Sequence, residues 1–327
     1  MSEPLLKIEN LTIVADNGKR KVELIHDLSL TIHKGETLGV VGESGSGKSM
    51  TAMAIMGLLP ANVQAVSGSI FYKGQDLLKL SKKEIRKIRG REIGMILQDP
   101  LTSLDPMFRI DSQIREAVRD RKTAAKKTVD EEVLGLLNSV SIPDPERRRR
   151  QFPHELSGGM RQRVVGAIGM AGSPELLIAD EPTTALDVTV QAGYLQLLSD
   201  LKKERDLSLM IISHDFGVIN RISDKVVVMY AGSAMEYGDV KELWKEPKHP
   251  YTIGLLNSLP HIGNRRERLV SIPGSAPIPG EITAGCPLPP DVTKQRKPAE
   301  KRPRKPSTES IRLSGACVMR IKDDACG

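Results

Sequence analysis

One eight-residue segment, residues 42–49, constrains the fold of this chain more than any other feature. Its sequence, GESGSGKS, matches the pattern GxxxxGK[ST] at every required position. The residues before it, ETLGVV, are typical of a buried strand, and those after it, SMTAMAIMGLL, are typical of a helix. Glycines in such a loop let backbone N–H groups wrap a phosphate at the helix N-terminus. The segment therefore predicts a phosphate-binding loop within an α/β domain.

The side chains that end this loop suit a nucleoside triphosphate. We expect Lys48 to neutralise the β- and γ-phosphate oxygens, and the Ser49 hydroxyl to ligate Mg²⁺. A glycine-rich turn without a ligand is the alternative, and the strand and helix on either side argue against it. The residues expected to bind nucleotide are Gly42, Glu43, Ser44, Gly45, Ser46, Gly47, Lys48, Ser49 and Met50.

The hydrophobic pattern predicts an α/β fold with a mainly parallel core sheet. Short β-branched runs alternate with helical segments up to about residue 240. A charged, helix-forming stretch at about residues 99–156 predicts a helical insertion. After residue 250 prolines become too frequent for long regular elements, which predicts an irregular C-terminal extension. The expected strands are residues 36–41, 92–97, 176–179, 207–213 and 225–230.

Composition limits the class of protein further. With 39% hydrophobic residues the chain is not disordered, and 3% aromatic residues argue against base stacking as its main activity. No apolar run reaches the roughly 18 to 20 residues of a membrane span, and the first residues lack the apolar core of a signal peptide. We therefore expect a cytosolic chain that only a partner would hold at a membrane. Most of the net charge of +7 lies in a proline-rich basic run at residues 291–306, which we interpret as a solvated tail.

Polar side chains stand at the ends of three expected strands. Asp180 is expected to hold the Mg²⁺ shell, and Glu181 beside it to polarise the attacking water. Gln98 follows another strand, where its amide can reach metal or water. His214 follows a third, where its imidazole can bind the γ-phosphate and orient the catalytic carboxylate. Each alone would be an ordinary polar strand end, but together they lie where such sheets bind ligands.

The segment LSGGMRQR at residues 156–163 predicts a capped helix start. Ser157 is the expected N-cap, and Gly158 and Gly159 leave backbone donors pointing outward. With the phosphate loop and the strand-end residues, it resembles the signature of the ATP-binding cassette family. The order of motifs matches that family over about residues 5–260, with ALD at 185–187 as the D-loop.

The resemblance implies an organisation and a shared site. It implies a nucleotide-binding core at residues 1–98 and 160–245 with an antiparallel β part, a helical signature subdomain at 99–159 and an extension at 246–327. The signature of one subunit would contact ATP held by the opposite subunit through Ser157, Gly158, Gly159 and Met160, beside the D-loop residue Asp187. The implied catalytic residues are Glu181, His214, Gln98 and Lys48, and the implied Mg²⁺ ligands are Ser49, Gln98 and Asp180.

Longer segments are similar to the dipeptide and oligopeptide permease branch of that family. They are QDPLTSLDP (98–106), FPHELSGGMRQR (152–163), ADEPTTALDVTVQA (179–192), HPYTIGLL (249–256) and IPGSAPIPGEITAGCP (272–287). This resemblance implies an ATPase that uses ATP and Mg²⁺ to power import of peptides, or of nickel or another small solute. Its implied partners are two transmembrane permeases, a second and paralogous ATPase subunit, and indirectly an extracytoplasmic solute-binding protein, with no nucleic acid. The implied location is peripheral, on the cytoplasmic face of the membrane.

Some residues depart from the family pattern. Met160 stands where most cassettes have glutamine, and residues 13–16 offer no aromatic side chain to stack on adenine, so we expect an apolar and weaker adenine contact. Relatives often carry four cysteines near the C-terminus, whereas this chain has Cys286, Cys317 and Cys326. A cluster needs four ligands or an external one, so we expect free thiols, with an iron–sulfur cluster as the alternative.

Two other functions stay open at this level. The basic tail suggests a soluble cassette ATPase that acts on nucleic acid or ribosomes, although the tandem cassettes or long coiled coil of such proteins are absent from the sequence. The missing adenine aromatic suggests a nucleotide-gated structural subunit, and the intact Glu181 and His214 argue against it.

Overall fold

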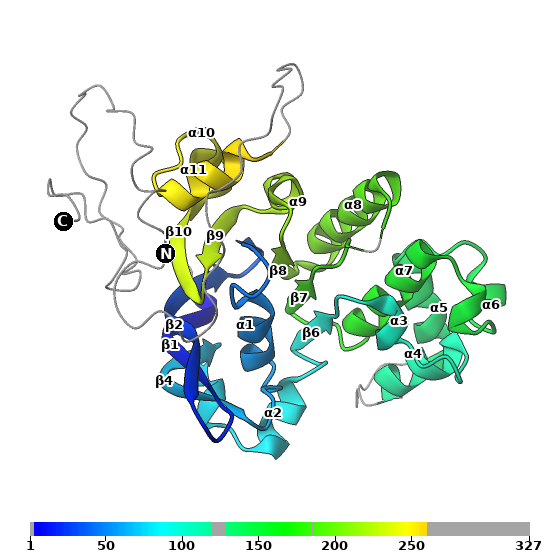
Figure 1. The fold of residues 1–327 in the computed structure, drawn as a ribbon. Helices are drawn as coiled ribbons and strands as arrows, with labels where there is room; N and C mark the ends of the chain where they lie inside the picture. The colour runs from blue at the N-terminus through cyan, green and yellow to red at the C-terminus, as the bar shows by residue number, and fades with distance from the viewer. Residues whose placement is uncertain (1–2, 120–127, 185, 260–327) are drawn as a thin grey trace, which may run out of the picture.

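A computed structural model describes residues 3–119, 128–184 and 186–259 of the chain, and it contains two sheets (Figure 1). The antiparallel sheet has the order β2-β1-β4-β5 and consists of β1 (Pro4–Asp16), β2 (Lys21–His33), β4 (Val63–Tyr72) and β5 (Gln75–Asp76). The core sheet has the order β10-β9-β3-β8-β7-β6 and consists of β3 (Thr37–Val41), β6 (Ile93–Ile96), β7 (Leu176–Asp180), β8 (Ser208–Ser213), β9 (Lys225–Tyr230) and β10 (Ser233–Asp239).

The core sheet confirms the expected parallel architecture. Strands β6, β7, β8, β3 and β9 are parallel to one another, and β10 is antiparallel to β9. Each of the five expected strands is present, with ends within one residue of the expected ones. Every residue of β3, β7 and β8 is buried, because helices or the second sheet cover both faces. Such strands have continuous apolar sequences, which is why they could be predicted.

The antiparallel sheet confirms the expected antiparallel part of the fold and covers one side of the core sheet. Its buried side chains, among them Ile8 and Ile25, form one apolar cluster with Val40 of β3 and with Ala52 and Ile55 of the helix that follows. This cluster holds the first helix between the two sheets (Figure 1). The phosphate loop and the start of α1 are thus fixed from two sides.

Helices cover the core sheet and form the insertion. The 3₁₀ segments are η1 (Leu77–Lys79) and η2 (Pro153–Glu155), and the helices outside the insertion are α1 (Lys48–Ile55), α2 (Lys82–Ile88), α8 (Val188–Arg205), α9 (Phe216–Ile222), α10 (Val240–Lys245) and α11 (Pro250–Asn257). The insertion contains α3 (Pro100–Ser103), α4 (Ile110–Arg119), α5 (Val129–Ser139) and α6 (Pro145–Arg148), and α7 (Gly158–Met170) leads back to the sheet. The expected helical insertion is therefore confirmed, and Figure 1 shows it on the far side of β6 from α1.

Apolar side chains at helical spacing hold the insertion together. Ile114 and Val118 of α4 are buried against Val133 and Leu137 of α5 and Val164 of α7. None of the described helices is both long enough and apolar enough to cross a membrane.

The predictions for the C-terminal region fall partly outside the described residues. Helix α11 forms the described start of the extension expected from residue 246. Proline at its first position suits a helix start, and His249 is its N-cap. The segment 272–287, the basic run at 291–306 and the cysteines Cys286, Cys317 and Cys326 lie outside the described residues.

Candidate functional site

The predicted phosphate loop connects β3 to α1. Gly45 and Gly47 have φ angles of 79° and 99°, a left-handed conformation that side chains other than glycine rarely adopt. A Cβ on Gly42 would lie 2.1 Å from the carbonyl oxygen of Met229, so the loop packs directly on the end of β9. The N–H of Gly232 in the β9–β10 turn also donates to the carbonyl of Ser46 at 3.1 Å. The glycines are therefore required by backbone shape and by this close contact.

Lys48 places a buried positive charge inside the loop. Its side chain is 4% exposed, and its Nζ donates to the carbonyl oxygens of Gly42 at 2.8 Å and Glu43 at 2.7 Å. Burial lowers the pKa of Lys48, and the nearby charges of Glu181 and Asp180 partly oppose that shift. An ammonium held this way is positioned for an incoming anion to pair with it.

Ser49 and Asp180 form an oxygen pair next to Lys48. The Ser49 hydroxyl donates to Oδ1 of Asp180 at 3.1 Å, joining the start of α1 to the end of β7. Asp180 is 6% exposed. Burial raises its pKa, and the charge of Glu181 adds to this, whereas the Ser49 hydrogen bond and the charge of Lys48 lower it. Oxygen atoms from a hydroxyl and a carboxylate are suitable ligands for a hard cation.

Three polar side chains contact the carboxylate of Glu181. Its Oε2 accepts from Gln98 Nε2 at 3.0 Å and from the Thr184 hydroxyl at 2.9 Å, and it lies 3.3 Å from His214 Nδ1. The backbone is also fixed, since the Glu181 N–H donates to Ile212 O at 2.9 Å and its φ is 44°. Gln98 follows β6 by two residues and His214 follows β8 directly. These three residues meet because the strands that precede them are adjacent and parallel.

Thr184 was not among the predicted site residues. Its hydroxyl binds the carboxylate three residues earlier in the same turn. A hydroxyl residue at this spacing after a strand-end acid was the available signal. Met50, which was predicted, is half-buried and packs on the apolar cluster between the sheets, and Ser44 is exposed at the tip of the loop.

The signature segment has the expected helix start. Ser157 is the N-cap of α7, and its hydroxyl accepts from the Met160 N–H at 3.3 Å, which confirms the predicted cap. A Cβ added to Gly158 would meet no described residue within 4 Å, whereas one on Gly159 would lie 2.7 Å from Val190 Cγ1. In Figure 1 α7 lies on the other side of β6 and β7 from α1.

The D-loop residue Asp187 is the N-cap of α8. Its Oδ1 accepts from the Val190 N–H at 3.0 Å, and Val190 in turn packs on Gly159 of the signature. The start of α8 and the signature are therefore in direct contact. Ala185 lies outside the described residues.

The neighbourhood named for adenine is in β1. Ile13 is 0% exposed and belongs to the apolar cluster between the sheets, and Val14 is buried as well, at 6% exposed. Ala15 and Asp16 are half-buried at the end of the strand. The expected adenine contact stays a prediction, and the residues available for it are Ala15 and Asp16 at the end of β1.

Two family models match the chain. The model described as "ABC transporter" matches residues 25–184, which contain the phosphate loop, the insertion and the strand that carries Asp180. The model described as "Oligopeptide/dipeptide transporter, C-terminal region" matches residues 235–297. The first match contains Gln98, the phosphate loop, the signature and Glu181, and the second contains the start of the extension; His214 lies between the two matches.

Curated relatives are similar over most of the chain. The oligopeptide transport ATP-binding protein OppD of Haemophilus influenzae is 46% identical over 287 residues, 88% of this chain and 88% of the relative. The protein of the same name from Bacillus subtilis is 48% identical over 84% of this chain and 77% of the relative. The dipeptide transport ATP-binding protein DppD of Bacillus subtilis is 44% identical over 88% of this chain and 86% of the relative.

Solved structures share the fold. An ATP-binding cassette whose structure was solved as a dimer, in a post-hydrolysis state with ADP and Pi, superposes with a TM-score of 0.65 at 25% identity. The superposition covers 72% of this chain and 98% of that chain. CbiO1 of Clostridium perfringens, part of a transporter complex, gives a TM-score of 0.65 at 26% identity over 78% of this chain and 96% of that chain.

Proposed function

We propose a mechanism for this chain from one premise: the chain belongs to the ATP-binding cassette family and is an ATP-hydrolysing subunit that energises peptide import. The predicted family, enzyme class and function are therefore confirmed. What we add is that Glu181 activates the water that attacks the γ-phosphate of ATP. The observation that carries this proposal is the cluster of Gln98, Thr184 and His214 on one oxygen of Glu181, beside the Ser49–Asp180 pair.

The phosphate loop would bind the triphosphate. Backbone N–H groups at the start of α1 would face the β-phosphate, and Lys48 would neutralise the β- and γ-oxygens. The carbonyl oxygens of Gly42 and Glu43 hold the lysine side chain in the loop, so little side-chain entropy remains to be lost on binding.

The residues next to Lys48 fit Mg²⁺. Ser49 and Asp180 already place a hydroxyl oxygen and a buried carboxylate oxygen 3.1 Å apart, and Mg²⁺ prefers oxygen ligands from one or two carboxylates completed by phosphates and water. The amide N–H of Gln98 donates a hydrogen bond to Glu181, so the amide oxygen is the atom that would face the cation. Bound Mg²⁺ would offset negative charge on the phosphates during the reaction.

Glu181 and His214 would act on the reacting groups. The three groups at Oε2 fix the carboxylate, leaving Oε1 to accept a proton from water. His214 is 56% exposed in its side chain, so its ring can reach a γ-phosphate from the open side of the site. The rigid hold on Glu181 reduces the reorganisation needed at the moment of attack.

A second cassette would complete the site. The signature residues Ser157 and Gly158 are exposed, and α7, which they begin, lies on the other side of β6 and β7 from α1. Backbone donors at the start of α7 would therefore contact the γ-phosphate of ATP in a second, paralogous subunit. Asp187 caps α8, and the start of α8 packs on the signature. Closure of the dimer would therefore move Asp187 and the signature together.

We infer that the permease subunits bind a patch beside Gln98. We call this patch the apolar rim; its members are Leu97, Leu101, Met107 and Phe108, whose exposures are 49%, 63%, 79% and 54%. Four exposed large apolar side chains within twelve positions are unusual for a surface that faces only water. The rim leads into a hollow of about 380 Å³ lined by Met107, Phe108, Arg109, Asp111, Ser112, Arg149, Arg150 and Phe152.

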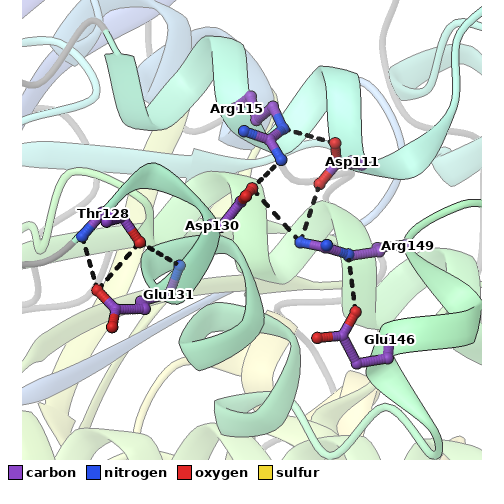
Figure 2. A network of polar contacts seen from close by, with 7 residues as sticks. All are labelled: Asp111, Arg115, Thr128, Asp130, Glu131, Glu146 and Arg149. Carbon is purple, nitrogen blue, oxygen red and sulfur yellow. Dashed lines mark hydrogen bonds and ion pairs between the residues drawn. The ribbon is translucent and has the colours of Figure 1, made fainter.

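Two residues that line this hollow, Asp111 and Arg149, belong to a network of ion pairs. Figure 2 shows Arg149 between Asp111 of α4, Asp130 of α5 and Glu146 of α6, with Arg149 Nε 3.1 Å from Glu146 Oε2. Arg115 pairs with Asp111 and Asp130 on the other side of the network. A rigid hollow with an apolar rim fits a short helix of a permease. This contact would place the chain at the cytoplasmic face of the membrane, with a solute-binding protein reached only through the permeases.

The same ion pairs engage a second basic segment, the four arginines at residues 147–150. Arg149 pairs with three carboxylates, and Arg148 donates to Gln151 at 3.0 Å. Two of the four arginines thus serve the fold of the insertion. We propose no nucleic-acid partner.

Co-purification from detergent-solubilised membranes tests the proposed permease contact. We expect the tagged chain to recover two polytopic permeases and a second cassette, and Phe108→Asp to lose the permeases. Val66→Asp is the matched control, since Val66 is a 52% exposed apolar residue on β4 of the other sheet. Recovery of permeases by Phe108→Asp at the control's level would contradict the proposed surface.

A further inference from the structure

A buried tyrosine of the C-terminal region lies against the phosphate loop. Tyr251, in the first turn of α11, is 0% exposed. Its ring packs on that of Tyr230 at the end of β9, with centroids 4.6 Å apart and planes tilted by 45°. The residue before Tyr230 is Met229, whose carbonyl touches Gly42. Tyr251 thus belongs to the layer that supports the loop from behind.

Polar contacts fix the start of α11 in this position. The carboxylate of Glu236 on β10 accepts from the N–H groups of Lys248 at 2.8 Å and His249 at 3.0 Å. The His249 side chain, 6% exposed, accepts in turn from the Tyr251 N–H at 3.2 Å. The helix start therefore cannot shift without breaking contacts to the core sheet, and Tyr251 is held firmly.

The hydroxyl of Tyr251 faces Glu43 of the loop. Burial raises the pKa of Tyr251, the charge of Glu43 raises it further, and the Glu43 backbone N–H near the phenolic oxygen opposes these shifts. Within the described part of the chain, however, the buried hydroxyl makes no hydrogen bond of ordinary geometry. A buried hydroxyl without a good partner carries a free-energy cost that a small movement of the loop would remove.

Side chains lie near both polar groups of the Glu43 backbone. Lys48 donates to the carbonyl at 2.7 Å, and Tyr251 faces the N–H. Phosphate bound in the loop competes with the carbonyl for the Lys48 ammonium, so the hold of Lys48 on Glu43 weakens. The Ser46 N–H still donates to this carbonyl at 3.2 Å, and among the described residues the Tyr251 hydroxyl is the side-chain group that would steady the Glu43 N–H.

We propose that Tyr251 is a positioning residue for the phosphate loop, whose hydroxyl accepts from the Glu43 N–H when nucleotide is bound, so that α11 contributes to nucleotide affinity. This inference rests on the proposed role of the loop as the ATP site. The start of the C-terminal region would then contribute directly to nucleotide binding.

The test compares Tyr251→Phe with Tyr194→Phe in the full chain. Both changes remove one hydroxyl from a buried ring; Tyr194 is 1% exposed, lies on α8 and has its hydroxyl beside Gly166 of α7. A fluorescent ATP analogue with Mg²⁺ measures Kd, and steady-state assays measure KM and kcat. We expect Tyr251→Phe to raise Kd and KM by about threefold to tenfold, the loss of one hydrogen bond, with kcat changed less than about twofold. Tyr194→Phe should leave Kd unchanged.

The melting temperature separates this role from a merely structural one. Without nucleotide, Tyr251→Phe should melt within about 2 °C of the parent protein, because the lost hydroxyl has no good partner there. With nucleotide, its stabilisation should be smaller than that of the parent. A Kd equal to the parent's, or an equal rise in both variants, overturns the inference while leaving the ATP site intact. If the parent chain binds no nucleotide, the proposed function itself fails.

Hydrogen exchange of the unmodified chain gives a second test that needs no variant. Nucleotide should slow exchange both in the loop peptide that contains Glu43 and in the peptide that contains Tyr251. Slowing in the loop with no change in α11 would overturn the inference.

Discussion

The amide nitrogen of Gln98 lies 3.0 Å from Oε2 of Glu181, although 83 positions separate the two residues. Gln98 stands between β6 and α3, where the chain leaves the core sheet for the insertion, and Glu181 directly follows β7. The exposed side chains Leu97 and Leu101 flank Gln98 on the surface. A movement of this surface would therefore shift Gln98, which is hydrogen-bonded directly to the proposed catalytic carboxylate.

Replacing Gln98 should slow hydrolysis more than it weakens binding. Gln98→Ala removes a donor to a charged carboxylate, a hydrogen bond of about 1.5–3 kcal/mol, so we expect kcat to fall about tenfold or more with KM for ATP nearly unchanged. Thr184→Val, which removes another donor to the same oxygen, should lower kcat in the same way. Steady-state kinetics checks both. A raised KM with normal kcat would assign Gln98 to binding alone.

Ser49 should control the Mg²⁺ requirement. Ser49→Ala removes the hydroxyl next to Asp180, so we expect the Mg²⁺ concentration for half-maximal ATPase activity to rise about tenfold. Thr51→Val is the control in the same helix, because the Thr51 hydroxyl donates to the Gly47 carbonyl instead. ATPase activity measured against Mg²⁺ concentration at saturating ATP distinguishes the two variants. An equal shift in both variants would mean that α1 was disturbed, and no shift in Ser49→Ala would remove Ser49 from the metal site.

Gly158 offers a test of the shared site that is free of steric effects within the chain. A Cβ at Gly158 meets no described residue within 4 Å, so Gly158→Ala should fold with unchanged stability and bind ATP normally. The assembled transporter should nevertheless lose most of its ATPase activity, since the new methyl group meets the ATP of the second cassette. Gly135→Ala on α5, which also has open space, should keep full activity. Normal turnover by Gly158→Ala would argue that the signature does not contact nucleotide.

Lys48 should make stability depend on pH in a defined direction. Burial lowers the pKa of Lys48 below its ordinary 10.5, so between the folded value and 10.5 the unfolded chain binds more protons than the folded one. The unfolding free energy of the parent protein, taken relative to Lys48→Met, should therefore rise as pH increases through that window. Urea unfolding at several pH values measures it, with exposed Lys82→Met as control. A difference that stays constant or falls would contradict the burial argument.

The core strands could be predicted because burial on both faces makes them continuous apolar runs, as in β8. The strands β1 and β2 could not be delimited in the same way. Register shifts between Ile8 and Leu11, and again between Leu11 and Val14, break the alternation that marks a strand with one buried face. The long antiparallel pair was expected only from the family resemblance.

The positions of the site residues were predictable because parallel strands end at a common edge. The partners of those residues were not. That Glu181 accepts from Thr184, and that Tyr251 lies behind Glu43, depends on how a turn and a distant helix pack on the sheet. Sequence spacing gives no distance for contacts between segments 208 positions apart.

The central claim, that Glu181 is the catalytic carboxylate, is tested most directly by Glu181→Gln in the purified transporter. The amide keeps the size of the side chain and removes its ability to take a proton from water. We expect ATP binding within about twofold of the parent protein, and turnover reduced by at least about a hundredfold. Hydrolysis at the parent rate with normal ATP binding would contradict the account.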